Sequence, residues 1–318
     1  MHRYFQLPTP ISYFLLLLKK TLLSIIGPTA IGKTSVAIHI AEHFNTEIIS
    51  ADSRQFYREL NIGTAKPSEE ELKKVKHHFI NSLSIHDAYN VGQFEMDALQ
   101  CLETIFKKHD VAIMVGGSGL FVNAVCDGLD QLPESDPELR EELKTLLDEK
   151  GIEALQAKLA QHDPEYFETV DRYNPHRLIR AIEVCLLTGM KYSELRKQEK
   201  KERNFAVVKI GLDDEREKVY GRINERVDEM IRKDLLNEAE DFFSFRHLNA
   251  LQTVGYSELF DFIEKKIPLQ EAIDLIKRNT RRYAKRQLTW FRKGEEIAWF
   301  KPEELNEIMR YAENKMKA

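Results

Sequence analysis

Lys33 and Thr34 are the first residues of this chain whose types and spacing indicate chemistry, because they close a G-x-x-x-x-G-K-[ST] loop. The glycines of such a loop let successive backbone N–H groups point inward, and the following helix directs its positive end to the same place. The lysine would add a point charge to bound phosphates, and the threonine hydroxyl would complete a Mg²⁺ shell. The pattern therefore predicts a bound polyphosphate. The predicted phosphate loop comprises Gly27, Pro28, Thr29, Ala30, Ile31, Gly32, Lys33 and Thr34.

Apolar runs must position this loop and bring other reactive groups to it. Residues 22–26 precede the loop as a buried strand, and residues 36–44 follow it with helical spacing. Further strands are expected at 47–51, 111–115 and 205–212. Alternating strands and helices predict an α/β fold with a parallel sheet. A loop of this type binds ATP and other nucleotides, but the motif alone identifies neither the ligand nor the reaction.

Asp52 directly follows the strand expected at residues 47–51. In doubly wound sheets, ligands bind outside the carboxyl ends of strands, so we expect Asp52 to face the same crevice as Lys33. A carboxylate at this place is suited to act as a general base or to hold a metal. The alternative is an N-cap for a helix beginning near Gln55, a role that the neighbouring Ser53 could also fill.

A glycine-rich turn at residues 116–119 follows the strand expected at 111–115, and it contains Ser118. P-loop ATPases carry an acidic Mg²⁺ ligand near this place. Its absence here argues against motor-type ATP hydrolysis and favours a group transfer in which the phosphate loop holds the leaving group. The glycines and the hydroxyl would let a substrate approach the backbone closely, and a simple tight turn is the alternative.

Two groups of basic residues could bind anions. Arg222 and Arg226 share one face of the helix expected after residue 212, either as a second phosphate clamp or as part of a surface salt-bridge stripe. Residues 277–293 contain eight basic and no acidic residues, interleaved with three aromatic ones. The whole chain of 318 residues has a formal charge of −5. So basic a helix on an acidic protein favours contact with a nucleic-acid backbone and stacked bases over a solvated face.

The remaining segments predict the domain organisation. Polar helices over residues 131–203 suggest a mostly helical insertion domain, with one helix that begins at Asn174-Pro175 and stops at Gly189. Residues 20–130 and 204–318 would then form a P-loop NTPase-like core, a parallel sheet flanked by helices.

The first 19 residues are expected to be a disordered extension rather than an export signal. Their apolar run at 11–18 is too short to span a membrane, and no cleavage site follows it. The three cysteines are scattered singly, which fits a reducing cytoplasm.

The chain resembles the tRNA dimethylallyltransferase (isopentenyltransferase) family in motifs that run in order from about residue 20 to residue 300. The combination of motifs is specific, although the phosphate loop alone is not. The motifs are GPTAIGKT at 27–34, DSRQFY at 52–57, IGTAKP at 62–67, VGGSGLF at 115–121, PHR at 175–177, VGY at 254–256 and KRQLTWF at 285–291.

The resemblance implies transfer of a dimethylallyl group from its diphosphate to N6 of the adenine 3′ of the anticodon, in tRNAs that read codons beginning with U. Diphosphate rather than ATP would occupy the loop. Asp52 would accept the N6 proton, Lys33 and Thr34 with Mg²⁺ would neutralise the departing diphosphate, and Ser118 would bond near the reacting groups. A cytoplasmic monomer bound to a tRNA anticodon stem-loop, with no membrane, is expected.

The resemblance also implies a set of tRNA contacts from several parts of the chain. These are Asp52, Ser53, Arg54, Gln55, Ser118, Arg140, His176, Arg177, Leu178, Ile179, Arg180, Gln252, Thr253, Val254, Gly255, Tyr256 and Ser257. The family usually has threonine at the position of Ser118, and both residues carry a hydroxyl. The zinc finger of some eukaryotic relatives has no counterpart here.

Three other functions are open to a chain with these features. A P-loop kinase for a small metabolite would transfer phosphate from ATP without RNA. An adenylate isopentenyltransferase would use free AMP and would lack the basic C-terminal half. A non-enzymatic RNA-binding switch would bind nucleotide and RNA and form no product.

Overall fold

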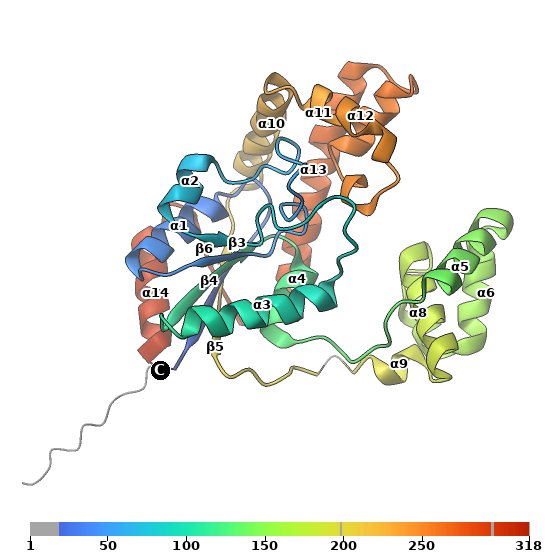
Figure 1. The fold of residues 1–318 in the computed structure, drawn as a ribbon, viewed down its shortest axis with the longest axis horizontal. Helices are drawn as coiled ribbons and strands as arrows, with labels where there is room; N and C mark the ends of the chain where they lie inside the picture. Colours follow the sequence, from blue (N-terminus) through green and yellow to red (C-terminus); the bar gives the residue numbers. More distant parts are fainter. Residues whose placement is uncertain (1–18, 198, 294–295, 318) are drawn as a thin grey trace, which may run out of the picture. The chain divides into compact units, whose positions relative to one another are not determined.

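The computed structural model describes residues 19–197, 199–293 and 296–317 (Figure 1). The chain folds into two compact units. One joins Met1–Val125 to Arg203–Ala318, and the other is Cys126–Glu202. The helical insertion thus begins a few residues before the predicted span of 131–203. The extension expected at residues 1–19 lies, apart from Lys19, outside the described residues.

The larger unit is built on a sheet of six strands in the order β3-β2-β4-β1-β5-β6, and every neighbouring pair is parallel. The predicted parallel sheet is therefore confirmed. The strand β1 lies between β4 and β5, and all six of its residues are buried. The strands are β1 (Thr21–Ile26), β2 (Ile48–Ser50), β3 (His77–His78), β4 (Val111–Gly116), β5 (Ala206–Leu212) and β6 (Ile297–Phe300).

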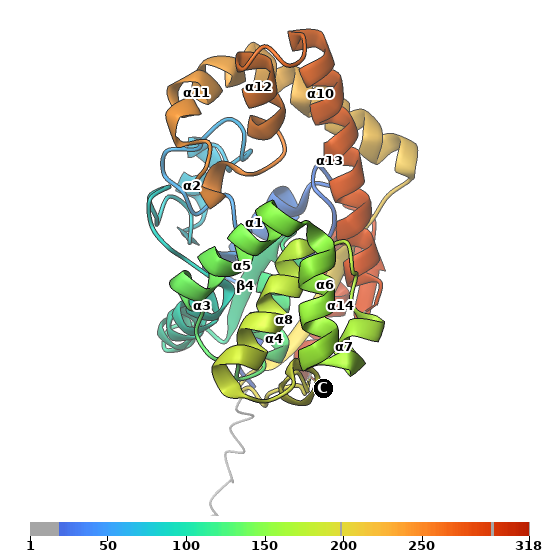
Figure 2. The same ribbon diagram turned by 90° about the vertical axis from the view of Figure 1, so that its right-hand side faces the viewer.

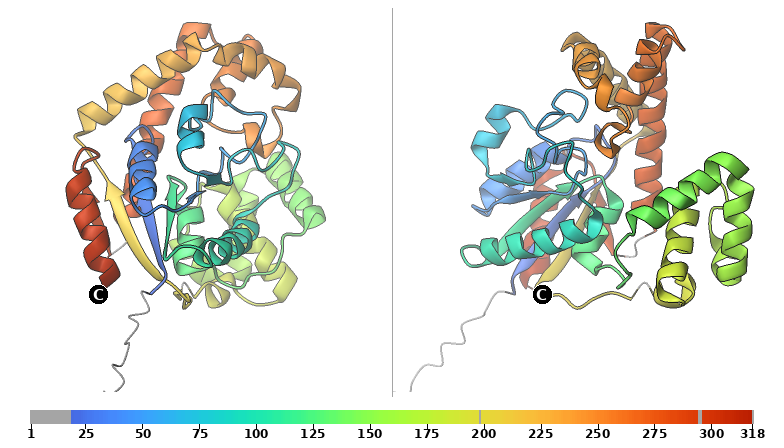
Figure 3. Two further views of the ribbon diagram at one scale, coloured as in Figure 1. Left: turned by 60° about the vertical axis from the view of Figure 1, so that its left-hand side comes forward. Right: turned by 45° about the vertical axis from the view of Figure 1, so that its right-hand side comes forward.

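Helices cover both faces of this sheet: α1 and α14 lie on one face and α3 on the other (Figure 3). Leu23 and Ile25 of β1 pack with Val36 and Ile40 of α1, as expected for buried strands in an α/β fold. The helices of this unit are α1 (Lys33–His43), α2 (Glu69–Lys74), α3 (Val91–Phe106), α4 (Gly119–Asp127), α10 (Arg216–Arg232), α11 (Leu235–Asp241), α12 (Tyr256–Ile263), α13 (Leu269–Phe291) and α14 (Leu305–Lys317).

A second core joins α10, α11, α12 and α13 beyond the sheet. Val227, Leu235, Leu259 and Ile276 are among its buried members. The helix α13 carries a stripe of buried residues at helical spacing, from Ala272 to Phe291. Its opposite side is therefore left to solvent, and this is the helix that contains the basic run.

Three local predictions from the sequence were wrong in this unit: a helix beginning near Gln55, a solvated helix over the charged run at residues 68–78, and a cap on α10 by Asp213 or Asp214. No helix begins near Gln55, where the chain makes turns and a single bridge from Tyr57 to Leu83. The charged run ends its helix at Lys74, because Val75 is extended and the next residues pair with β2 as strand β3. No aspartate caps α10, since its N-cap residue is Glu215, without a side-chain hydrogen bond.

The smaller unit is wholly helical in its described part, and α5, α6 and α8 lie side by side (Figure 2). Asn174 caps α8 with its side chain, and Gly189 ends it at φ 70°, as predicted. Leu155 and Ile182 are in its core. Its helices are α5 (Pro137–Lys150), α6 (Ile152–His162), α7 (Pro164–Thr169), α8 (Pro175–Thr188) and α9 (Tyr192–Leu195).

None of the described helices has the length and apolar composition needed to cross a membrane.

Candidate active site

The phosphate loop joins β1 to α1, as the sequence predicted. Gly27 has φ 149° and Gly32 has φ 99°, conformations that favour glycine. A Cβ on Gly27 would also lie 2.5 Å from the backbone oxygen of Leu212, so β5 packs directly against the loop. Gly32 is the N-cap of α1, and the helix therefore points its unpaired N–H groups at the loop.

Lys33 lies in the first turn of α1, and its side chain folds back over the loop. The Nζ atom donates a hydrogen bond of 2.7 Å to the backbone oxygen of Pro28. Burial lowers the pKa of Lys33 to about 8, the Asp52 carboxylate opposes this shift, and the Arg226 charge adds to it. A poorly hydrated ammonium among backbone N–H groups is a strong attractor for an anion.

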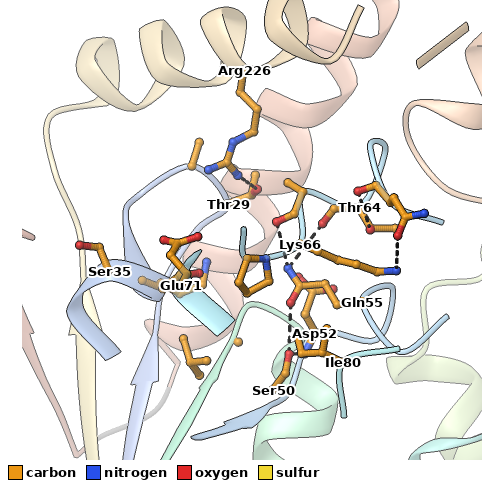
Figure 4. A pocket seen from close by; sticks show the side chains of 18 of the residues that line it. Thr29, Ser35, Ser50, Asp52, Gln55, Thr64, Lys66, Glu71, Ile80 and Arg226 are labelled. Carbon is orange, nitrogen blue, oxygen red and sulfur yellow. Dashed lines mark hydrogen bonds between the residues drawn. The ribbon is translucent and has the colours of Figure 1, made fainter. Parts of the chain in front are cut away.

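Asp52 and Lys33 line the same cavity, which has a volume of about 490 Å³. Figure 4 labels Asp52 among the lining residues. Asp52 follows β2, and its Oδ1 atom accepts the N–H of Arg54 at 3.1 Å. The carboxylate thus stabilises a turn rather than a helix, and it keeps lone pairs for a substrate. Thr34 lines the cavity as well, next to Lys33 on α1.

Ser118 is held by the turn that contains Asp52. Its Oγ accepts the N–H of Ser53 at 3.2 Å and lies 3.2 Å from the Ser53 hydroxyl. Tyr283 of α13 joins this group: desolvation of its hydroxyl raises its pKa to about 12 although the residue as a whole is 37% exposed, Asp52 acts in the same direction, and a hydrogen bond with Ser118 opposes them. Sequence reasoning counted Tyr283 only among the aromatics of the basic helix, since a single sequence cannot show which residue it meets.

A second wall of the cavity comes from the segment at residues 61–67. Gln55 reaches it through Nε2, which donates to the backbone oxygens of Thr64 and Ala65 at 3.4 and 3.3 Å (Figure 4). Lys66 lines the cavity too, and its Nζ donates to the backbone oxygen of Tyr57 at 2.7 Å. Burial lowers the pKa of Lys66 to about 8. The sequence motif at 62–67 points to the family, but no role for its residues follows from the motif.

Glu238 of α11 holds this segment in place. Its carboxylate accepts the N–H groups of Asn61, Ile62 and Gly63 at 2.9 to 3.1 Å, and the Tyr256 hydroxyl donates to it at 2.6 Å. Gly63 packs so closely on the Tyr256 ring that a Cβ there would lie 2.6 Å from it. Sequence reasoning missed Glu238, because its partners are far away in the chain.

Replacing Glu238 with alanine should lower the free energy of unfolding by about 3 kcal/mol, since several buried donors lose their acceptor together. Tyr256→Phe is the matched control: it removes one donor, leaves three N–H groups on the carboxylate, and should cost about 1 kcal/mol. Urea unfolding of both variants measures the difference. Equal losses would mean that the carboxylate does not organise the segment.

The two arginines predicted as a phosphate clamp have different surroundings. Arg226 lines the cavity and extends from α10 toward Thr29, with Nη1 3.5 Å from Oγ1 (Figure 4). Arg222 is instead bonded to Asp214, with 2.7 Å between Nη2 and Oδ2, and the Asp214 side chain is 2% exposed. The geometry therefore favours Arg226 alone as a phosphate ligand.

Arg226→Ala should weaken the binding of inorganic diphosphate about tenfold, because a charge-assisted hydrogen bond is lost. Arg222→Ala should leave that affinity within about twofold and lower the free energy of unfolding by about 2 kcal/mol, since Asp214 loses a charge-assisted hydrogen bond but keeps Lys218 at 3.9 Å. Calorimetric titration and urea unfolding of both variants separate the two effects. A large affinity loss in Arg222→Ala would contradict the assignment.

The residues that the resemblance placed on tRNA differ in their surroundings. Arg54 donates to the backbone oxygens of Asn249 and Gln252 at 2.6 and 3.4 Å, so two of the implied segments meet. Several others have buried or internally bonded side chains in their own unit. Leu178 and Ile179 are in the core of the helical unit, and Tyr256 is wholly buried.

Arg140 and Arg180 belong to the internally bonded group. Both donate to the buried carboxylate of Glu183, at 2.8 and 2.6 Å. Closer to the solvent in this unit are His176 and Arg177, in the first turn of α8. A motif does not distinguish residues that form internal ion pairs or pack in a core from residues that contact RNA. The resemblance therefore placed residues of all three kinds on tRNA.

Among the described residues, three side chains of the basic run on α13 have acidic or amide partners. Lys277 pairs with Asp228 at 2.6 Å, Arg281 donates to Asn224 at 2.6 Å, and Arg292 pairs with Asp213. The side chains of Lys285 and Arg286 are exposed. Tyr283 and Trp290 on the same helix are 37% and 40% exposed.

This fold and this cavity define a P-loop protein of the doubly wound α/β class, with a carboxylate opposite its phosphate loop. The IPP transferase family model matches residues 55–294. The tRNA dimethylallyltransferase of Christiangramia forsetii is 56% identical over 296 residues, which cover 93% of this chain and 98% of that protein. The chain belongs to the IPP transferase family.

Two solved structures of transferases that act on tRNA are also similar to this chain. A tRNA isopentenylpyrophosphate transferase from Bacillus halodurans aligns with a TM-score of 0.69 at 37% identity, covering 94% of this chain and 97% of that one. A eukaryotic dimethylallyltransferase acting on tRNA aligns with a TM-score of 0.75 at 25% identity, covering 89% of this chain and 74% of that one.

Proposed function

We propose that this protein transfers a dimethylallyl group from dimethylallyl diphosphate to N6 of the adenine 3′-adjacent to the anticodon, in tRNAs that read codons beginning with U. The observation that carries the proposal is one cavity with a phosphate loop on one side and the Asp52 carboxylate on another. The relatives named tRNA dimethylallyltransferase support this substrate pair. A monomer working in the cytoplasm is part of the proposal.

The diphosphate end of the donor would lie on the phosphate loop. Backbone N–H groups at the start of α1, the Lys33 ammonium and the Arg226 guanidinium would share its negative charge. These groups are in place before the donor binds, so the charge that develops on the leaving group meets fixed positive partners. An allylic C–O bond breaks readily once its leaving group is stabilised in this way.

Thr34 would hold Mg²⁺ at this end of the cavity. The described residues contain no group of three or more His, Cys, Asp or Glu side chains that could hold a metal. Mg²⁺ commonly keeps several waters and uses phosphate oxygens with few protein ligands, so one hydroxyl beside a diphosphate fits it. When bound, the cation would neutralise charge on the diphosphate.

The adenine would present N6 to Asp52. In the transfer the C1–O bond to diphosphate breaks, the C1–N6 bond forms, and the N6 proton passes to the Asp52 carboxylate. Ser118 and Tyr283 lie beside this carboxylate and could bond to the base or stack on it. The base must leave its stack to reach the cavity, so the protein needs a grip on the surrounding RNA loop.

The exposed basic and aromatic side of α13 would supply part of that grip. Lys285 and Arg286 offer charge for the phosphate backbone, and Trp290 offers a surface for stacking. A small-molecule kinase or an AMP-dependent isopentenyltransferase would have no use for such a surface. This feature favours an RNA acceptor over those two alternatives.

The test is to incubate the full chain with unmodified tRNA, Mg²⁺ and dimethylallyl diphosphate labelled in the allyl group. Label should enter the RNA and be recovered on a single adenine after nuclease digestion. Parallel reactions replace tRNA by AMP and the donor by γ-labelled ATP. Label on AMP alone, phosphate transfer from ATP, or no labelled RNA would each overturn the proposal.

A further inference from the structure

Gln287 is a buried polar residue of α13 that connects two walls of the cavity. It is 6% exposed. Its Oε1 atom accepts the N–H of Thr29 in the phosphate loop at 2.9 Å, and its Nε2 atom donates to the backbone oxygen of Gly117 at 2.9 Å. One carboxamide therefore bonds to the loop after β1 and to the turn after β4, which are the two sides on which the proposed substrates meet.

The bond to Thr29 has a direct consequence for Lys33. The N–H of Thr29 and the carbonyl of Pro28 belong to the same peptide unit, and that carbonyl accepts the Lys33 ammonium at 2.7 Å. A planar peptide group cannot turn one end without the other. As long as Gln287 holds the N–H, the carbonyl that places the Lys33 ammonium cannot rotate away.

The conformation of Ala30, the residue after Thr29, indicates that the phosphate loop needs such support. Ala30 has φ 61°, a left-handed conformation that costs a residue with a side chain about 1 kcal/mol and that only its surroundings can maintain. Proline precedes Thr29 and cannot donate a hydrogen bond of its own. The Gln287 carboxamide is thus the group that holds the Thr29 N–H.

The bond to Gly117 ties the same side chain to the acceptor side. Gly117 precedes Ser118, whose hydroxyl meets the Ser53 turn next to Asp52. Any Cβ on Gly117 would overlap the Gln287 amide, so the turn is shaped to receive it. The carboxamide sets the distance between the loop that binds diphosphate and the turn that faces the base.

We propose that Gln287 is a positioning residue: it locks the Pro28–Thr29 peptide so that Lys33 is aligned for the diphosphate, and it holds the Ser118 turn against the same loop. The inference rests on the proposed function of the cavity. It assigns no contact between Gln287 and the substrates, so its effect must pass through the phosphate loop.

The first test measures the binding of inorganic diphosphate to the full chain by calorimetry, with no RNA present. Gln287→Leu should weaken binding at least about tenfold, because the Thr29 N–H and the Gly117 oxygen lose their partner and the peptide is free to turn. Gln270→Leu is the matched control: it makes the same change at an exposed site on the same helix and should bind as the parent does.

Gln287→Glu supplies a readout that loss of packing would not move. A protonated carboxyl group is shaped like the carboxamide and can both accept from Thr29 and donate to Gly117, whereas the ionised form has no donor. Burial disfavours ionisation, so this variant should approach parental affinity at pH 5.5 and lose it progressively until it binds about tenfold more weakly than the parent at pH 8. Comparing the variant with the parent at each pH removes changes common to both proteins, such as deprotonation of Lys33 or of the diphosphate itself.

The outcomes are distinct. If Gln287→Leu binds diphosphate as tightly as the parent, Gln287 does not position the loop, while the proposed function stands. If Gln287→Glu binds diphosphate weakly at every pH, charge or packing rather than the two hydrogen bonds is responsible, and the inference is wrong. The same conclusion follows if Gln287→Glu binds diphosphate weakly while Gln287→Leu binds it as the parent does. If the parent itself binds no diphosphate, the phosphate site is lost and the inference with it.

Discussion

Replacing Asp52 with asparagine should lower the rate of dimethylallyl transfer by roughly 10² to 10⁴, the contribution that a positioned general base makes. Asparagine keeps the shape of the side chain and the oxygen that accepts the Arg54 N–H at 3.1 Å, so the turn should survive. What it removes is the capacity to take a proton from N6. Single-turnover assays with saturating tRNA and donor measure the change in the chemical step directly.

Two control measurements test whether Asp52→Asn changes substrate binding rather than proton transfer. The Asp52→Asn variant should still bind inorganic diphosphate within about threefold of the parent at pH 7, because Lys33 and Arg226 remain in place. It should also bind the anticodon stem-loop in a gel-shift assay. Turnover within about tenfold of the parent would show that another group accepts the proton, and loss of diphosphate binding would show that the cavity has been disturbed.

The second large effect is expected at Lys33. Lys33→Met should reduce the affinity for inorganic diphosphate by roughly 10² or more, because an ammonium that lies within the phosphate loop loses its charge in a poorly solvated place. The transfer rate should fall further, since negative charge on the leaving group grows toward the transition state. Calorimetric titration and single-turnover rates report the two losses separately.

The pH dependence of binding provides an independent check on Lys33. Burial lowers its pKa to about 8 in the free protein, and a bound diphosphate favours the protonated form. Affinity should therefore be full below about pH 8 and fall as the pH rises above it. Lys33→Arg, which stays charged, should bind more weakly but flatten this fall. A fall of equal size in Lys33→Arg would assign it to another group.

Much of the larger unit could be predicted from local patterns. The strands at β1, β2, β4 and β5 were expected from apolar runs, because buried strands of a parallel sheet need apolar side chains on both faces. The phosphate loop could be found because its function depends on backbone conformation and on residues adjacent in the chain. Asp52 could be expected opposite Lys33, since the carboxyl ends of parallel strands share one edge.

The short strands β3 and β6 were not predicted. For β3 the reason lies in how the strand forms. Two residues, His77 and His78, form β3 by pairing with β2, and their polar side chains carry no strand signal. The turn at Gln55 also depends in part on a distant segment, because Gln55 donates to the backbone oxygens of Thr64 and Ala65 in addition to the local bond from the Arg54 N–H to Asp52. Where partners are distant, propensity gives little information.

The parallel sheet, the phosphate loop after β1, the carboxylate after β2 and the basic character of α13 all follow from the amino-acid sequence without coordinates. Only the three-dimensional packing shows that Arg226 rather than Arg222 faces the cavity. It also shows that Glu238 and Gln287 hold the walls of the cavity, and that Leu178 and Tyr256 are buried. The difference is one of range. Patterns of polarity and backbone conformation act over a few residues, whereas the partner of a buried polar side chain is chosen by packing between segments that lie far apart in the chain.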